Sequence, residues 1–164
     1  MPINTNGYRD FGIGLGVNDV AYPHSLEIRI DPQLNNGADV LCLYTGTLVF
    51  AAKGKTAQAW HRGSMAARVP TPGRRWSPTT IARGPGWTIF MDGSVVLSLA
   101  SIYNAGTANY AGWAVDAAIV EAVTPAAVPQ PDDHLQIQAL IAVRDSDGYL
   151  NRLAYQVSAL GRTI

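Results

Sequence analysis

Arginine, lysine and tryptophan gather in one stretch of this chain that contains no acidic residue. Between Asp39 and Asp92 lie seven of the twelve basic residues and three of the four tryptophans. Basic side chains with interleaved aromatic rings can hold a phosphate backbone, stack on sugar rings or meet an acidic protein surface. Binding chemistry of these three kinds is therefore the first to consider.

The sharpest candidate within this stretch is Arg74-Arg75-Trp76, flanked by Pro72-Gly73 and Ser77-Pro78. A tryptophan at the tip of a Pro/Gly loop has few core partners, and exposed Trp and Arg are typical anchors of interfaces. The acid-free stretch offers these arginines no local salt-bridge partner, so we predict that the loop is a contact surface and not core. The full predicted interaction surface is Arg62, Arg68, Arg74, Arg75, Trp76 and Arg83. For Trp60 and Trp87, core and surface positions both stay open.

Three motifs resemble ligand sites but fail on spacing. Gly12 to Gly16 imitates a dinucleotide fingerprint, yet the sixth position is Val17 instead of glycine. Gly54-Lys55-Thr56 imitates the end of a phosphate-binding loop without its upstream glycine. Asp145-Ser146-Asp147-Gly148 could begin a calcium loop, but loop position twelve is Gln156, so a structural turn is expected.

Catalytic and metal chemistry find little support in the remaining residues. His24, His61 and His134 share no metal-ligand spacing. The single Cys42 lies in an apolar run, which predicts a small buried hydrophobe and allows no intrachain disulfide. No serine stands in a Gly-x-Ser-x-Gly elbow. We therefore predict no catalytic residue, no metal, no cofactor and no enzymatic activity.

Charge and composition favour an assembly over a free monomer. Charged residues make up 15% of the chain, against about 25% in an average soluble domain. The net charge is zero, which disfavours non-specific nucleic-acid binding and gives a monomer little charge to stay soluble. No signal peptide and no apolar stretch long enough to span a bilayer are found. We expect synthesis in the cytoplasm without a signal peptide; the protein could leave the cell by lysis, for instance as part of a released particle such as a virion, or by a route without a cleaved signal.

Strand patterns must position the candidate residues. Alternating apolar residues at 135–143 and 153–157 flank the Asp145–Gly148 turn and predict a β-hairpin. A second hairpin is predicted over 87–102, with Asp92-Gly93 as its turn. Residues 25–30 and 40–51 add further strands, with Gly46 at a bulge or bend.

Three segments are less regular. Residues 63–86 hold four prolines and four glycines, which predicts a long irregular loop. Residues 110–123 alternate like a strand but are rich in alanine, which also suits a short helix; we favour the strand. Residues 123–131 predict a stiff, extended connector. Less than about a tenth of the chain is expected to be α-helix, well under the average for globular proteins.

Together these patterns predict an all-β fold, an antiparallel two-sheet β-sandwich. Jelly-roll-like and immunoglobulin-like strand orders both stay open. Residues 1–10 are expected to form an extended N-terminal arm, and residues 11–164 a single domain.

The function expected from these features is a non-enzymatic structural subunit of a larger oligomeric assembly. A phage-like virion accessory protein, such as a head decoration, spike base or tail component, is the best example of the type. The expected partners are further copies of the chain and other subunits, met through an acidic partner surface. The alternative is a carbohydrate-binding module or lectin that uses Trp76, Trp60 or Tyr103 to stack on a glycan.

Overall fold

Every regular element of the protein is a β-strand in the parts of the chain that the structure describes. The computed structural model describes residues 19–30, 38–53, 60–78, 84–103, 112–125, 132–144 and 149–164. No helix occurs in these ranges, which confirms the all-β prediction. The predicted N-terminal arm at 1–10 and most of the connector at 123–131 lie outside the described residues.

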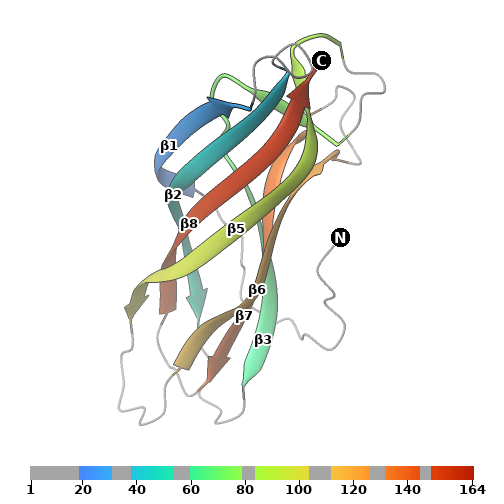
Figure 1. Ribbon diagram of the computed structural model, residues 1–164. Helices are drawn as coiled ribbons and strands as arrows, with labels where there is room; N and C mark the ends of the chain where they lie inside the picture. The colour runs from blue at the N-terminus through green and yellow to red at the C-terminus, as the bar shows by residue number, and fades with distance from the viewer. Residues whose placement is uncertain are drawn as a thin grey trace.

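The strands form two sheets (Figure 1). The five-stranded sheet has the order β1-β2-β8-β5-β4, and the three-stranded sheet has the order β3-β7-β6. All neighbours are antiparallel except β4 and β5. The strands are β1 (Asp19–Arg29), β2 (Asp39–Lys53), β3 (His61–Arg68), β4 (Arg75–Ser77), β5 (Trp87–Tyr103), β6 (Gly112–Val123), β7 (His134–Arg144) and β8 (Tyr149–Thr163).

One hydrophobic cluster takes side chains from both sheets. From the five-stranded sheet it includes Cys42, Tyr44 and Leu48 of β2 and alternate residues of β8. From the three-stranded sheet it includes alternate residues of β7, between Leu135 and Val143. Because side chains alternate between the faces of a strand, these positions define the inner face of each sheet.

The predicted hairpin over 87–102 is wrong, because β5 runs through Asp92-Gly93 as one continuous strand paired with β8. The pairing shifts between Phe90 and Asp92, which marks a β-bulge. The Asp92 carboxylate accepts a hydrogen bond of 2.8 Å from the Gly93 N–H. A Cβ on Gly93 would lie 2.8 Å from the Ser158 carbonyl oxygen, so glycine is needed for close contact and not for a turn.

The predicted hairpin over 135–157 is also wrong, although both of its strands exist. β7 is the central strand of the three-stranded sheet, whereas β8 is the central strand of the other. The connection therefore crosses from one sheet to the other. The Asp145–Gly148 turn itself lies outside the described residues. An alternating run reports that a segment is a strand, but not which strand it pairs with.

The predicted irregular loop at 63–86 is largely replaced by strand and core. In β3 every second residue is buried, with Met65 and Ala67 in the core cluster. Val69 follows them into the core, and the short strand β4 pairs with β5.

Two smaller expectations concern residues 110–123 and Gly46. The strand favoured for 110–123 is confirmed as β6. Gly46 keeps a regular register with Tyr155, and the irregularity lies across from it on β1. There the pairing jumps from Ala21 to His24, and Tyr22 has a positive φ of 54°.

Candidate interaction surface

The outer face of the five-stranded sheet carries a group of aliphatic side chains on three neighbouring strands. Ile28 of β1 pairs with Leu41 of β2, which pairs in turn with Leu160 of β8. In the next row on the same face, Leu26 pairs with Leu43. We call these five residues, Leu26, Ile28, Leu41, Leu43 and Leu160, the outer apolar patch.

This patch faces away from the core. Val40, Cys42 and Tyr44 of β2 belong to the core, so Leu41 and Leu43 between them point to the opposite face. Leu26 is 57% exposed and Ile28 is 45% exposed, while the other three side chains are half-buried. Contiguous exposed apolar surface on a soluble protein typically marks a contact site.

Polar residues surround the patch. On one side lies the ion pair between Arg162 Nε and Asp39 Oδ1, at 2.7 Å, whose residues pair across β8 and β2. The hydrogen bond to Asp39 raises the pKa of Arg162, which therefore keeps its charge. On β5 and β8 the patch is bordered by the exposed Asp92, which pairs with Leu160, and by Ser94, Ser158 and Gln156. The apolar area is thus bounded and has both signs of charge at its rim.

Val96 provides a contrast on the same face of the sheet. It is 62% exposed, yet its neighbours across the sheet are Gln156, then Thr45, then His24. A single exposed apolar side chain among polar ones is ordinary on a protein surface. Among the described residues of this face, only the rows through Leu41 and Leu43 combine several such side chains.

The prediction that Trp76 is a surface residue is wrong. Its side chain is 1% exposed and is among the largest fully buried side chains. The indole Nε1–H donates a hydrogen bond of 2.9 Å to the Tyr44 hydroxyl, and its ring meets Phe90 edge-on at 6.2 Å. Burial raises the pKa of Tyr44, which keeps this hydroxyl protonated. The Pro/Gly-flanked segment therefore directs its tryptophan into the core.

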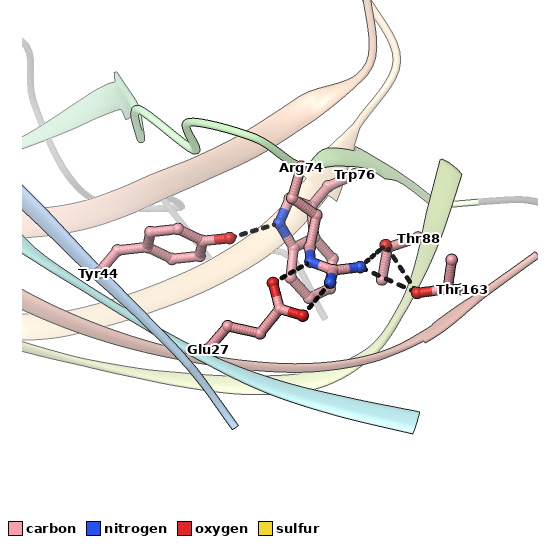
Figure 2. A network of polar contacts seen from close by, with 6 residues as sticks. All are labelled: Glu27, Tyr44, Arg74, Trp76, Thr88 and Thr163. Atoms are coloured by element: carbon pink, nitrogen blue, oxygen red, sulfur yellow. Dashed lines mark hydrogen bonds and ion pairs between the residues drawn. The ribbon is translucent and has the colours of Figure 1, made fainter. Parts of the chain in front are cut away.

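Arg74 has partners on three other strands (Figure 2). Its guanidinium binds both carboxylate oxygens of Glu27 on β1 and donates to Thr88 Oγ1 at 2.6 Å and Thr163 Oγ1 at 2.9 Å. Although burial acts to lower the pKa of Arg74, the contacts with Glu27 and other groups raise it overall. Arg74 thus ties the β3–β4 connection to β1, β5 and β8.

Two further arginines of the predicted surface also have acidic partners, contrary to expectation. Arg62 Nε lies 2.9 Å from Asp116 Oδ2 of β6, the opposite edge strand of the three-stranded sheet, across β7. Arg68 forms a two-pronged pair with Asp132, at 2.9 and 3.0 Å, and this pairing lowers the pKa of Asp132. Both arginines remain exposed.

The last two arginines of the predicted interaction surface are Arg75 and Arg83. Arg75 stacks over the ring of Trp87, with its Cζ 4.9 Å from the ring centroid. Arg83 lies outside the described residues. The structure therefore brings Arg68, Arg74 and Arg75 together on one side of the molecule, and does not place Arg62 with them.

A shallow groove of about 470 Å³ lies between these three arginines. Three prolines line it together with Val69, Trp76 and His134. Asp133 also lines it, but its carboxylate is buried and accepts a hydrogen bond of 2.6 Å from Ser77. Since Arg68 and Arg74 are already paired with carboxylates, the groove has little unpaired positive charge to attract an anion.

Residues considered for metal or sugar binding are separated. Among the described residues, no group of three His, Cys, Asp or Glu side chains could hold a metal ion. Trp60 is 37% exposed, and Arg144 stacks on its ring at 4.9 Å. The side chain of Tyr103 lies outside the described part of the structure. Within the described ranges, no helix is long and apolar enough to cross a membrane.

The outer apolar patch was missed at the level of sequence, although a signal was present. In a strand, Leu41-Cys42-Leu43 places apolar side chains on both faces. A core covers only one of these faces, so the other is left exposed. Leu26 and Ile28 alternate with Glu27 and so present a second apolar stripe. Comparisons with protein-family models, with curated proteins and with solved structures find no match to this chain.

Proposed function

We propose that this chain is a non-enzymatic structural subunit of an oligomeric assembly, which it joins through the outer apolar patch. The observation that carries the proposal is the patch itself: five neighbouring aliphatic side chains on the outside of a sheet. Burying such surface is worth roughly 25 cal/mol per Å² of apolar area, which favours association over exposure to water. The low content of charged residues supports the same role.

We also propose a jelly-roll-like sandwich for the two sheets. In the five-stranded sheet β2 pairs with β8. In the other sheet β3, the strand after β2, pairs with β7, the strand before β8. Such nested pairing in alternate sheets results when one long antiparallel ribbon wraps around a common core. Jelly rolls occur in viral capsids and lectins, but a fold alone assigns no function. A virion accessory protein thus remains our specific proposal for the kind of assembly, and capsid, portal or tail genes beside its gene would support it.

The alternative function, a carbohydrate-binding module, is less favoured because Trp76 is not available to stack on a sugar ring. Trp76 is buried and hydrogen-bonded, and one face of Trp60 is covered by Arg144. An acidic partner held by the arginines is also less favoured than an apolar one, since Arg62, Arg68 and Arg74 already hold carboxylates.

Light scattering or sedimentation of the full chain tests the proposed function. We expect a mass that is a multiple of 17.5 kDa and falls toward 17.5 kDa on dilution. Leu26→Lys should shift the protein to 17.5 kDa at concentrations where the wild type associates, because a charge would enter an apolar contact.

Val96→Lys is the matched control, because it adds the same charge to an equally exposed position outside the patch. Its mass should equal that of the wild type, and both variants should keep the thermal midpoint of the wild-type monomer. A wild type that stays at 17.5 kDa at every concentration, or equal effects of both variants, would refute the proposal.

A further inference from the structure

We propose that the outer apolar patch packs against the same patch of a second copy of this chain, related by a two-fold axis. This inference rests on the proposed function and specifies its contact. A two-fold contact uses one surface twice, so that surface must complement itself. The patch meets this requirement in its centre and at its rim.

The centre of the patch is apolar on three sides, and Asp39 lies on the fourth. Leu41 has Ile28 and Leu160 as its neighbours across the sheet, and Leu43 follows it on the same face of β2. Its side chain is half-buried among them. An axis that passes near Leu41 brings aliphatic side chains of one copy onto aliphatic side chains of the other.

The rim of the patch carries Arg162, Asp39 and the exposed Asp92, which pairs with Leu160 on the β5 side. Asp39 and Arg162 lie beside the Leu41–Leu160 row, at 2.7 Å from one another, and Arg162 is half exposed. Across a two-fold axis, the arginine of each copy can approach an aspartate of the other copy, so that charges of opposite sign meet. Since the chain has no net charge, overall repulsion between two copies is also absent.

A partner of other chemistry would fit this surface less well. An acidic partner would meet five uncharged side chains and only one arginine, which is already paired with Asp39. A glycan would find no aromatic ring among the five patch residues to stack on. A second copy supplies both the apolar area and rim charges of both signs.

Complementary charges at the centre of the patch test the symmetry directly. Leu41→Lys alone and Leu41→Asp alone should each weaken self-association by at least about a hundredfold, since like charges would meet near the axis. Mixing the two variants in equal amounts should restore association, because Lys then faces Asp. Sedimentation with one variant fluorescently labelled would show a mixed complex that neither variant forms alone.

The outcomes separate this inference from the proposed function. If the wild type associates and both variants dissociate, but their mixture stays dissociated, the patch contacts a different surface and the two-fold contact is refuted. The proposed function would survive that result, whereas a monomeric wild type would refute both. Circular dichroism and thermal melting of each variant confirm that it is folded. Leu41→Arg mixed with Leu41→Glu provides a second pair at the same position, should either of the first two Leu41 variants fail to fold.

Discussion

At the scale of single residues, two buried tyrosine hydroxyls have opposite environments. The Tyr44 hydroxyl accepts the hydrogen bond of Trp76 Nε1, whereas the Tyr155 hydroxyl is buried and has no hydrogen-bond partner within the described residues. Tyr155→Phe should leave the free energy of unfolding unchanged or raise it by up to about 1 kcal/mol, because it removes a desolvated hydroxyl. Urea denaturation measures this change.

Tyr44→Phe is the matched comparison for Tyr155→Phe. It removes the acceptor of a buried indole N–H and should cost about 1–3 kcal/mol. If Tyr155→Phe proved as costly as Tyr44→Phe, the Tyr155 hydroxyl would have a partner that the described residues do not include.

The ion pair of Arg68 and Asp132 predicts a pH dependence with a definite sign. The pKa of Asp132 is lowered in the folded protein by its hydrogen bonds with Arg68. A lowered carboxyl pKa contributes stability above the unfolded value of about 3.9, and that contribution is lost as the pH falls through the folded value. In Arg68→Gln, the pKa of Asp132 measured by NMR titration should return to the ordinary range. An unchanged pKa would mean that Arg68 does not bind it in solution.

Burial and pairing of individual residues were the least predictable features of this chain. The gap in acidic residues implied unpaired arginines, but the partners of Arg62, Arg68 and Arg74 are 54, 64 and 47 positions away. Trp76 looked exposed for a similar reason, because its hydrogen-bond acceptor is 32 positions away. Local sequence reports neighbours along the chain, whereas a sheet brings together residues that are far apart in it.

At the scale of strands, the packing of the Trp76 side chain in the core depends on a glycine of β8. A Cβ on Gly161 would lie 2.5 Å from Trp76 Cζ3 and 2.7 Å from the Ile89 carbonyl oxygen. Gly161→Ala should therefore lower the free energy of unfolding by about 1–3 kcal/mol, the usual cost of overpacking a core. Thermal and urea denaturation of the variant measure this loss.

Gly84→Ala is the control for that substitution. A Cβ at Gly84 would meet nothing within 4 Å, so its effect on stability should be small. If the two variants were equally stable, the indole of Trp76 would not pack on Gly161 as the structure indicates.

Strands were predictable from sequence, but their pairing was not. The alternation in 134–144 and in 112–123 places one face of each strand against the core cluster, which local sequence records directly. Asp92-Gly93 misled the prediction because the same dipeptide suits a turn and a bulge. The choice between them depends on Ser158 and Val120, which crowd Gly93 from other strands.

At the scale of the whole molecule, salt distinguishes an apolar contact from an electrostatic one. Raising the salt from 0.1 to 1 M shortens the Debye length from about 10 Å to about 3 Å. Association through the outer apolar patch should keep its dissociation constant or become tighter. Association through Arg68 and Arg75 should instead weaken by more than about tenfold. Sedimentation at both salt concentrations distinguishes the two surfaces.

The central position of β8 has a consequence for how the protein is made. β8 is synthesised after the seven other strands that the structure describes, yet it joins β2 to β5, and its partners on β2 lie 96 to 123 positions earlier in the chain. A nascent chain that does not yet include β8 therefore contains β2 and β5 without the strand that pairs with both of them. Because such distant pairings are slow to form, we expect this sheet to close only after β8 has been synthesised, and the unfinished chain to depend on protection by chaperones until then.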